Sequence, residues 1–253
     1  MVAQGWRPLP SYFCIRIFVL AIRFPLLARR IHKWLALFVG IQVVIWTVTG
    51  FYMVTIHIDY IHGDHFIQTP ATQPFNVDRL IDAPEVVAAH PEAQEVRLQR
   101  LFERPVWRVR SAEGSFLVDA ATGEKLPPLT KEQVHQAARR VYTGDPTIVS
   151  SRLLTEAPPE IQTVKPPIWQ IGFEGWNQPT LYISPTTGEL ITRRHNLWRI
   201  FDFAWMLHIM DYENRTNVNN PLLRVATWSA VLMALSGAWL LIWSFPRRKR
   251  KKA

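Results

Sequence analysis

The chain has 253 residues, a net charge of +9, 48% hydrophobic residues and one cysteine, Cys14. A single cysteine excludes an intrachain disulfide, a C-x-x-C pair and a C-x-x-C-H site for covalent haem. G-x-G-x-x-G, Walker A, G-x-S-x-G and H-E-x-x-H motifs are absent, so nucleotide-cofactor and common hydrolase classes have no support. Basic residues gather near the two ends rather than in the middle, which argues against a nucleic-acid partner.

Residues 1–30 are predicted to form a cytoplasmic, amphipathic lead-in. The stretch 11–30 is apolar but is interrupted by Arg16, Arg23 and Pro25, unlike the apolar region of a signal peptide. Such a pattern is typical of a helix that lies in the membrane interface. A mis-assigned translation start is the alternative explanation for this stretch.

Residues 31–57 predict the first transmembrane helix. Its core, Trp34–Ile56, has 23 residues without a charge. At ~1.5 Å per residue, this length crosses a hydrocarbon core of about 30 Å. Arg29, Arg30 and Lys33 precede it, which favours a cytoplasmic N-terminal side.

Residues 58–194 predict a polar domain in which one pattern occurs twice, at about 75–126 and 129–192. In the first copy, Pro105–Val109 and Phe116–Glu124 form a hairpin that ends in Thr-Gly-Glu. Pro167–Ile171 and Leu181–Glu189 repeat this pattern in the second copy. Glycine favours the positive φ of such a turn.

A helix is predicted before each hairpin. The first lies within Asn76–His90, where Pro84 divides it, and Val96, Leu98 and Leu101 then alternate as in a strand. The second is Lys131–Tyr142, with Thr130 and Gln133 in the positions of a capping box. Two such units predict an α+β domain.

The last quarter of the chain predicts a return to the membrane. Residues 195–220 read as an aromatic interfacial helix and a turn, and we expect this helix to pack against the membrane surface and the first span. Residues 221–246 predict the second transmembrane helix, followed by a basic cytoplasmic tail at 247–253. The fold class is therefore an α+β membrane protein, with two transmembrane helices enclosing a periplasmic domain and both termini cytoplasmic.

Several phrases resemble the PepSY-associated transmembrane family over residues 30–245: Arg30–Trp34, Thr49-Gly50, Asp119–Gly123 and Leu207-His208. This family is often described as iron-regulated membrane proteins. The resemblance implies two PepSY-like helix/β-hairpin repeats outside the membrane. Larger relatives resemble haem-bearing inner-membrane reductases of siderophores but have four or more spans, whereas this chain has two. In other settings the PepSY module is associated with inhibiting or chaperoning proteases.

Two histidines flank the first predicted span. His32 and His57 are 25 residues apart, which at about 100° per residue places both on nearly one helix face, roughly 37 Å apart. Gly50 shares that face, and a glycine would let a flat macrocycle approach the backbone. The two histidines are therefore candidate axial ligands of haem, and the alternative is that both are interfacial residues.

His208, on the aromatic helix, could supply the second axial ligand of a b-type haem opposite His57. The alternative is a core or interfacial histidine that is hydrogen-bonded to the backbone. The last span contains no histidine, so a haem at His32 would need its second ligand from another subunit.

Other polar residues give weaker signals. His62-Gly-Asp-His65 could bind a metal ion, but a solvated turn is the favoured interpretation and no metal site is predicted. His90, His135 and His195 are predicted to be surface residues. Asp59, Asp202 and Asp211 are interpreted as interfacial helix-end charges rather than catalysts.

Two functions remain open from the sequence. The first is a haem-linked redox or accessory component of iron and siderophore uptake in a bacterial inner membrane, with haem b as cofactor. If this chain is an enzyme, it would be a haem-dependent ferric-siderophore reductase, whose catalytic residues are unknown. The second is a non-enzymatic periplasmic module that binds or regulates an envelope protease or transporter. The expected partners are the lipid bilayer and either siderophore-transport proteins or a second copy of the chain.

Overall fold

The computed structural model describes the backbone of residues 11–69 and 79–244. The chain divides into two compact units. The helical unit comprises Met1–Tyr52 with Ala204–Ala253, and the sheet unit comprises Met53–Phe203. Four predictions lie wholly or partly outside the described residues: the start of the lead-in, the start of the first repeat, the end of the second predicted span (245–246) and the whole basic tail 247–253.

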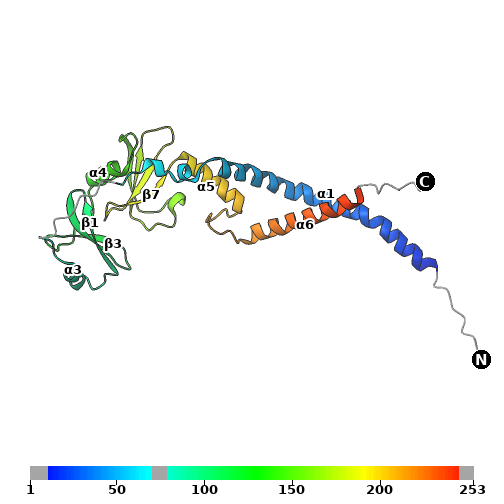
Figure 1. Cartoon of the computed structure of the whole chain (residues 1–253), viewed down its shortest axis with the longest axis horizontal. Helices are drawn as coiled ribbons and strands as arrows, with labels where there is room; N and C mark the ends of the chain where they lie inside the picture. The colour runs from blue at the N-terminus through cyan, green and yellow to red at the C-terminus, as the bar shows by residue number, and fades with distance from the viewer. Residues whose placement is uncertain (1–10, 70–78, 245–253) are drawn as a thin grey trace, which may run out of the picture. The chain divides into compact units, whose positions relative to one another are not determined.

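The helical unit contains long apolar helices (Figure 1). They are α1 (Ser11–Thr55) and α6 (Pro221–Ser244). Within them, Arg29–Thr55 and Pro221–Ile242 are long and apolar enough to cross a membrane, and almost none of either is buried inside the protein (11% and 0%). Their apolar side chains therefore face outward, as expected for contact with lipid.

Helix α1 differs from its prediction at both ends. It is continuous from Ser11, so the predicted lead-in is part of the same helix over its described residues. It ends at Thr55, two residues before the predicted boundary at residue 57. Helix α5 (Asn196–Ile209) confirms a helix in the aromatic segment, and its residues from Ala204 onward belong to the helical unit.

The sheet unit contains two antiparallel sheets. The first sheet has three strands in the order β1-β2-β3: β1 (Glu95–Leu101), β2 (Arg104–Arg110) and β3 (Ser115–Asp119). The second has four in the order β4-β5-β6-β7: β4 (Ile148–Leu154), β5 (Ile168–Phe173), β6 (Thr180–Ile183) and β7 (Leu190–Arg194). Short helical segments complete the unit: α2 (Ile58–His62), η1 (Asp64–Phe66), α3 (Ala83–Ala89), α4 (Lys131–Val141) and η2 (Pro159–Ile161).

A helix precedes and packs on each sheet. Helix α4 begins with the predicted capping box of Thr130 and Gln133. Its buried Val134 and Ala138 pack on the second sheet in a core that includes Phe173. In the first sheet the corresponding core is built around three valines, Val86 of α3 with Val109 and Val118. Pro84 lies in the first turn of α3 instead of dividing a longer helix, because proline needs no amide partner there.

The two Thr-Gly-Glu turns have matching hydrogen bonds. In the first, the Gly123 amide donates to the Asp119 carbonyl and the Asp119 amide to the Glu124 carbonyl, at 3.0 and 2.9 Å. In the second, Gly188 donates to Ser184 and Ser184 to Glu189, both at 3.0 Å. Both glycines have positive φ, 75° and 70°. The internal repeat in the sequence therefore has a counterpart in local structure.

The second turn also joins the two sheets. The Arg108 guanidinium donates to both oxygens of Glu189, at 2.7 and 2.9 Å. A Cβ on Gly188 would lie 2.8 Å from Leu129 Cδ1. This glycine is therefore required by both its backbone conformation and its packing.

Candidate functional site

The carbonyl end of α5 is held by side chains of the helical unit. The last carbonyls of a helix have no partner within it. Trp46 Nε1 of α1 donates to the His208 carbonyl at 2.8 Å, and Asn220 Nδ2 donates to the Ile209 carbonyl at 2.8 Å. Gln42 Nε2 reaches the Leu207 carbonyl at 3.5 Å. These contacts fix the backbone that carries His208.

The His208 imidazole packs on the Thr49-Gly50 dipeptide of α1. Its Nδ1 lies 2.9 Å from Thr49 Oγ1. A Cβ added to Gly50 would lie 3.7 Å from His208 Cε1, an ordinary van der Waals distance, so the ring lies beside Gly50 and an alanine would also fit there. Gly50 was predicted to pack against a macrocycle, and in the structure the ring beside it is the imidazole.

His208 also lines an apolar cavity of about 520 Å³ that is widely open at the surface of the helical unit. The cavity wall combines His208 and Trp46 with one face of α6: Leu223, Thr227, Ala230, Val231 and Ala234, together with Ile209. The volume falls within the range typical of small-molecule and cofactor sites, roughly 300–1,000 Å³. Within the described part of the chain, no hydrogen bond occupies His208 Nε2. An imidazole nitrogen at the wall of an apolar cavity is chemically suited to bind haem iron.

His32, near the other end of the first candidate span, has similar surroundings. Its Nδ1 lies 2.7 Å from Ser236 Oγ of α6. A Cβ on Gly237 would lie 3.1 Å from His32 Cε1, which is closer than nearly all real Cβ contacts. The ring therefore rests directly on the backbone of the facing helix.

His57 does not continue the face of α1 that carries His32, and the prediction of a shared helix face is wrong. Because α1 ends at Thr55, His57 is the N-cap of α2, with φ −58° and ψ 137°. Its Nδ1 accepts a hydrogen bond from the Asp59 amide at 3.4 Å. The ring is largely exposed, within the sheet unit.

His195 is fully buried, so its predicted surface position is wrong. Asn177 Nδ2 donates to its Nδ1 at 3.2 Å, while Asn177 Oδ1 accepts from the Leu197 amide at 3.2 Å. A Cβ on Gly63 would lie 2.9 Å from His195 Cδ2. Burial, and secondarily the nearby His65, lower the pKa of His195 to about 4. This neutral imidazole packs α2 and η1 against the start of α5.

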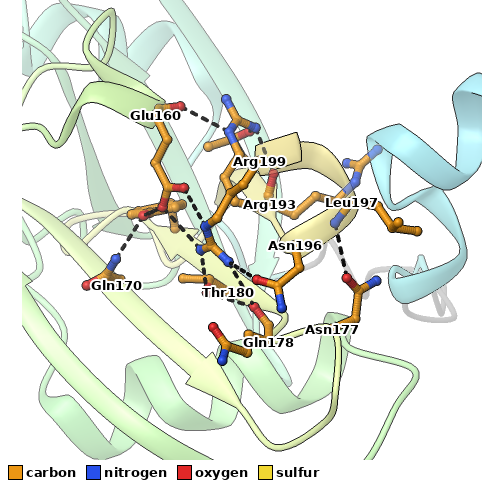
Figure 2. A network of polar contacts seen from close by, with 12 residues as sticks. Glu160, Gln170, Asn177, Gln178, Thr180, Arg193, Asn196, Leu197 and Arg199 are labelled. Carbon is orange, nitrogen blue, oxygen red and sulfur yellow. Dashed lines mark hydrogen bonds and ion pairs between the residues drawn. The ribbon is translucent and has the colours of Figure 1, made fainter. Parts of the chain in front are cut away.

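A partly buried polar network surrounds the start of α5 (Figure 2). Arg199 Nε donates to Glu160 Oε2 at 2.8 Å, and an Arg199 amino group donates to Thr180 Oγ1 at 3.2 Å. The Tyr182 hydroxyl donates to Glu160 Oε1 and accepts from Gln170. Burial, and then the Glu160 carboxylate, raise the pKa of Tyr182. No sequence pattern predicted this network, because its members come from four separate elements: η2, β5, β6 and α5.

The His62–His65 loop does not assemble a metal centre. The Asp64 carboxylate pairs with Arg193, which also donates to the His62 carbonyl at 2.9 Å. The His65 ring contacts Phe66 and His195. Among the residues that the structure describes, no group of three or more His, Cys, Asp or Glu side chains could hold a metal ion.

Asp211 has a structural role in the loop between α5 and α6. Its carboxylate accepts hydrogen bonds from four backbone amides, of which the two shortest come from Asn217 and Thr216 at 2.9 and 3.0 Å. The Asn217 amide leads the contacts that lower the pKa of Asp211. The carboxylate therefore organises the loop, as expected of an acceptor that satisfies several amides.

Comparison with known proteins identifies the family. The family model described as the PepSY-associated TM region matches residues 29–253, and the chain belongs to this family. It is accordingly a membrane protein of the PepSY type, and its long apolar helices lie in a lipid bilayer. No curated protein and no solved structure matches the chain.

Proposed function

We propose that the chain is a haem-linked redox or accessory component of iron and siderophore handling in a bacterial inner membrane. The observation that carries this proposal is the His208 imidazole, which lies on Thr49-Gly50 and lines the apolar cavity. The family resemblance supplies the connection to iron.

His208 would hold one haem through its Nε2, and His32 would hold a second haem in the same way. His57 is the remaining candidate ligand from the sequence. A bound haem would supply one-electron chemistry. The protein supplies an apolar wall beside His208 and a hydroxyl that lies beside each ring nitrogen Nδ1, and Gly50 has no side chain on the part of α1 that His208 contacts.

The proposed orientation places both termini in the cytoplasm and residues 58–194 in the periplasm. The basic residues near Lys33 and the run at 247–252 support this orientation. Alkaline phosphatase inserted at Gly114 should be active, and a fluorescent protein fused after Ala253 should fluoresce. The opposite pattern would overturn the orientation.

The redox role is tested by electron transfer to a ferric siderophore. Purified full-length protein would be reduced with dithionite, freed of excess reductant and mixed with the ferric complex under argon. We expect the reduced α band to disappear and ferrous iron to be trapped by a chelator. A His90→Ala variant should behave as wild type, since His90 lies outside the helical unit. Reduced haem that remains reduced would contradict the redox role.

A second candidate function is the non-enzymatic interaction module. Strand β4 is at an edge of the second sheet, and two of its apolar side chains, Val149 and Leu153, are 63% and 46% exposed. Exposed edges of this kind accept a strand from a partner. This function predicts that iron-dependent growth survives His208→Ala and His32→Ala but is lost in Val149→Lys. The reverse pattern supports the haem-linked role.

A further inference from the structure

His32 and His208 contact the same kind of dipeptide on the facing helix. His208 lies on Thr49-Gly50 of α1, and His32 lies on Ser236-Gly237 of α6. In each case a hydroxyl oxygen lies within 3 Å of Nδ1 (2.9 and 2.7 Å) and a glycine faces Cε1. Helix α1 thus provides the Thr49 hydroxyl that contacts His208, and it also carries His32.

Each hydroxyl has another partner on its own helix. Thr49 Oγ1 donates to the Ile45 carbonyl at 2.8 Å, and Ser236 Oγ donates to the Met233 carbonyl at 2.8 Å. This bond to the preceding turn is a common geometry for helical Ser and Thr. A hydroxyl has one hydrogen and two acceptor lone pairs. With its hydrogen on the carbonyl, each hydroxyl can bond the imidazole only as an acceptor.

We propose that Thr49 and Ser236 are positioning residues that hold His208 and His32 in the Nδ1–H tautomer. The Nε2 lone pair of each ring is then free to bind a metal centre that takes neutral imidazole. The identity of that centre as haem rests on the proposed function. Metal-binding histidines commonly donate their other ring N–H to a fixed acceptor, which sets the tautomer and the ring orientation.

His195 of the sheet unit has the opposite arrangement. Its Nδ1 accepts from the side-chain amide nitrogen of Asn177. In its neutral form this ring carries the hydrogen on Nε2. His195 is therefore an internal reference for the other tautomer.

Nitrogen NMR of the haem-free, full-length protein tests the proposal directly. The protein would be labelled with ¹⁵N-histidine and held in detergent at about pH 8, above the ordinary pKa of free histidine, about 6.5. We expect Nδ1–H signals for His208 and His32 and an Nε2–H signal for His195. Thr49→Val should abolish the Nδ1–H signal of His208 and leave that of His32 unchanged, and Thr49→Ser should restore it.

Ser236→Ala should have the matching effect on His32, with Ser236→Thr as the conservative rescue. A haem titration should then show that Thr49→Val binds haem at least about 10-fold more weakly than the wild type, in line with the loss of outer-shell contacts at other metal sites. An Nε2–H signal for His208 in the wild type, or a signal that Thr49→Val does not change, would overturn the inference. Because the NMR experiment needs no haem, absence of haem from the protein would contradict the proposed function separately.

Discussion

A single histidine illustrates how tertiary contacts decide the chemistry of a residue. His195 is fully buried, and its Nδ1 accepts from Asn177 Nδ2, while Asn177 Oδ1 accepts from the Leu197 amide. Gly63 has no side chain, which leaves room for the His195 ring. The surroundings therefore favour the uncharged imidazole, and its pKa is lowered from 6.5 to about 4.

This shift makes stability depend on pH in a defined window. Between pH 6.5 and about 4 the unfolded chain binds a proton at His195 and the folded chain does not. The contribution of His195 to the free energy of unfolding is therefore complete above pH 6.5, and it falls as the pH is lowered toward 4. Since one pKa unit corresponds to about 1.4 kcal/mol, the loss is on the order of 3 kcal/mol over the window.

The measurement is thermal unfolding of the full chain in detergent as a function of pH, beside His195→Gln. We expect the variant to be less stable at pH 7 and its stability to vary less with pH below 6.5. The exposed His57 offers a matched control, because His57→Gln should leave the pH dependence intact. Equal pH dependence in wild type and His195→Gln would contradict the assignment.

At the scale of elements, the start of α5 is fixed by side chains from two other segments, η2 and β6. Arg199 bonds Glu160 of η2 and Thr180 of β6, and Tyr182 donates to the same carboxylate. The Arg199 and Glu160 side chains are 32% and 18% exposed. Removal of one partner would leave the other partly buried and unpaired, which is the costly case for an ion pair.

Arg199→Met should therefore lower the free energy of unfolding by about 1–3 kcal/mol, after allowance for solvent screening at this exposure. Arg152→Met on the exposed side of β4 is the control and should change stability by less than about 0.5 kcal/mol. Urea unfolding in detergent, followed by tryptophan fluorescence, would measure both. A loss in Arg199→Met no larger than that of the control would show that the network does not stabilise the fold.

Much of the element structure could be predicted from local sequence signals. Thr130 and Gln133 marked the start of α4, and the Thr-Gly-Glu turns at Gly123 and Gly188 marked the hairpins. The residues of strands β4 and β7 were not identified, because their buried and exposed side chains do not alternate strictly along the sequence. His57 was misassigned because an uncharged apolar run does not mark the residue at which a helix ends.

At the scale of the whole molecule, the two candidate spans and the PepSY-associated family assignment define a membrane protein. The sequence named His32, His208 and Gly50 as site candidates. It could not reveal Thr49 or Ser236 as partners of the rings, because each pair is separated by more than 150 residues (|i−j| = 159 and 204). Contacts of this kind depend on how α1, α5 and α6 pack.

The proposed function requires that this protein binds haem through imidazoles of its helical unit. The most direct measurement is the absorption spectrum of detergent-purified protein, oxidised and dithionite-reduced, expressed with ample haem supply. We expect a Soret band and sharp reduced α and β bands in the wild type. These bands should be weakened in His208→Ala and in His32→Ala, and lost in the double variant. The control His135→Ala should leave them unchanged. His57→Ala tests the remaining ligand candidate. A colourless wild type, or bands that persist in the double variant, would contradict haem binding through His208 and His32.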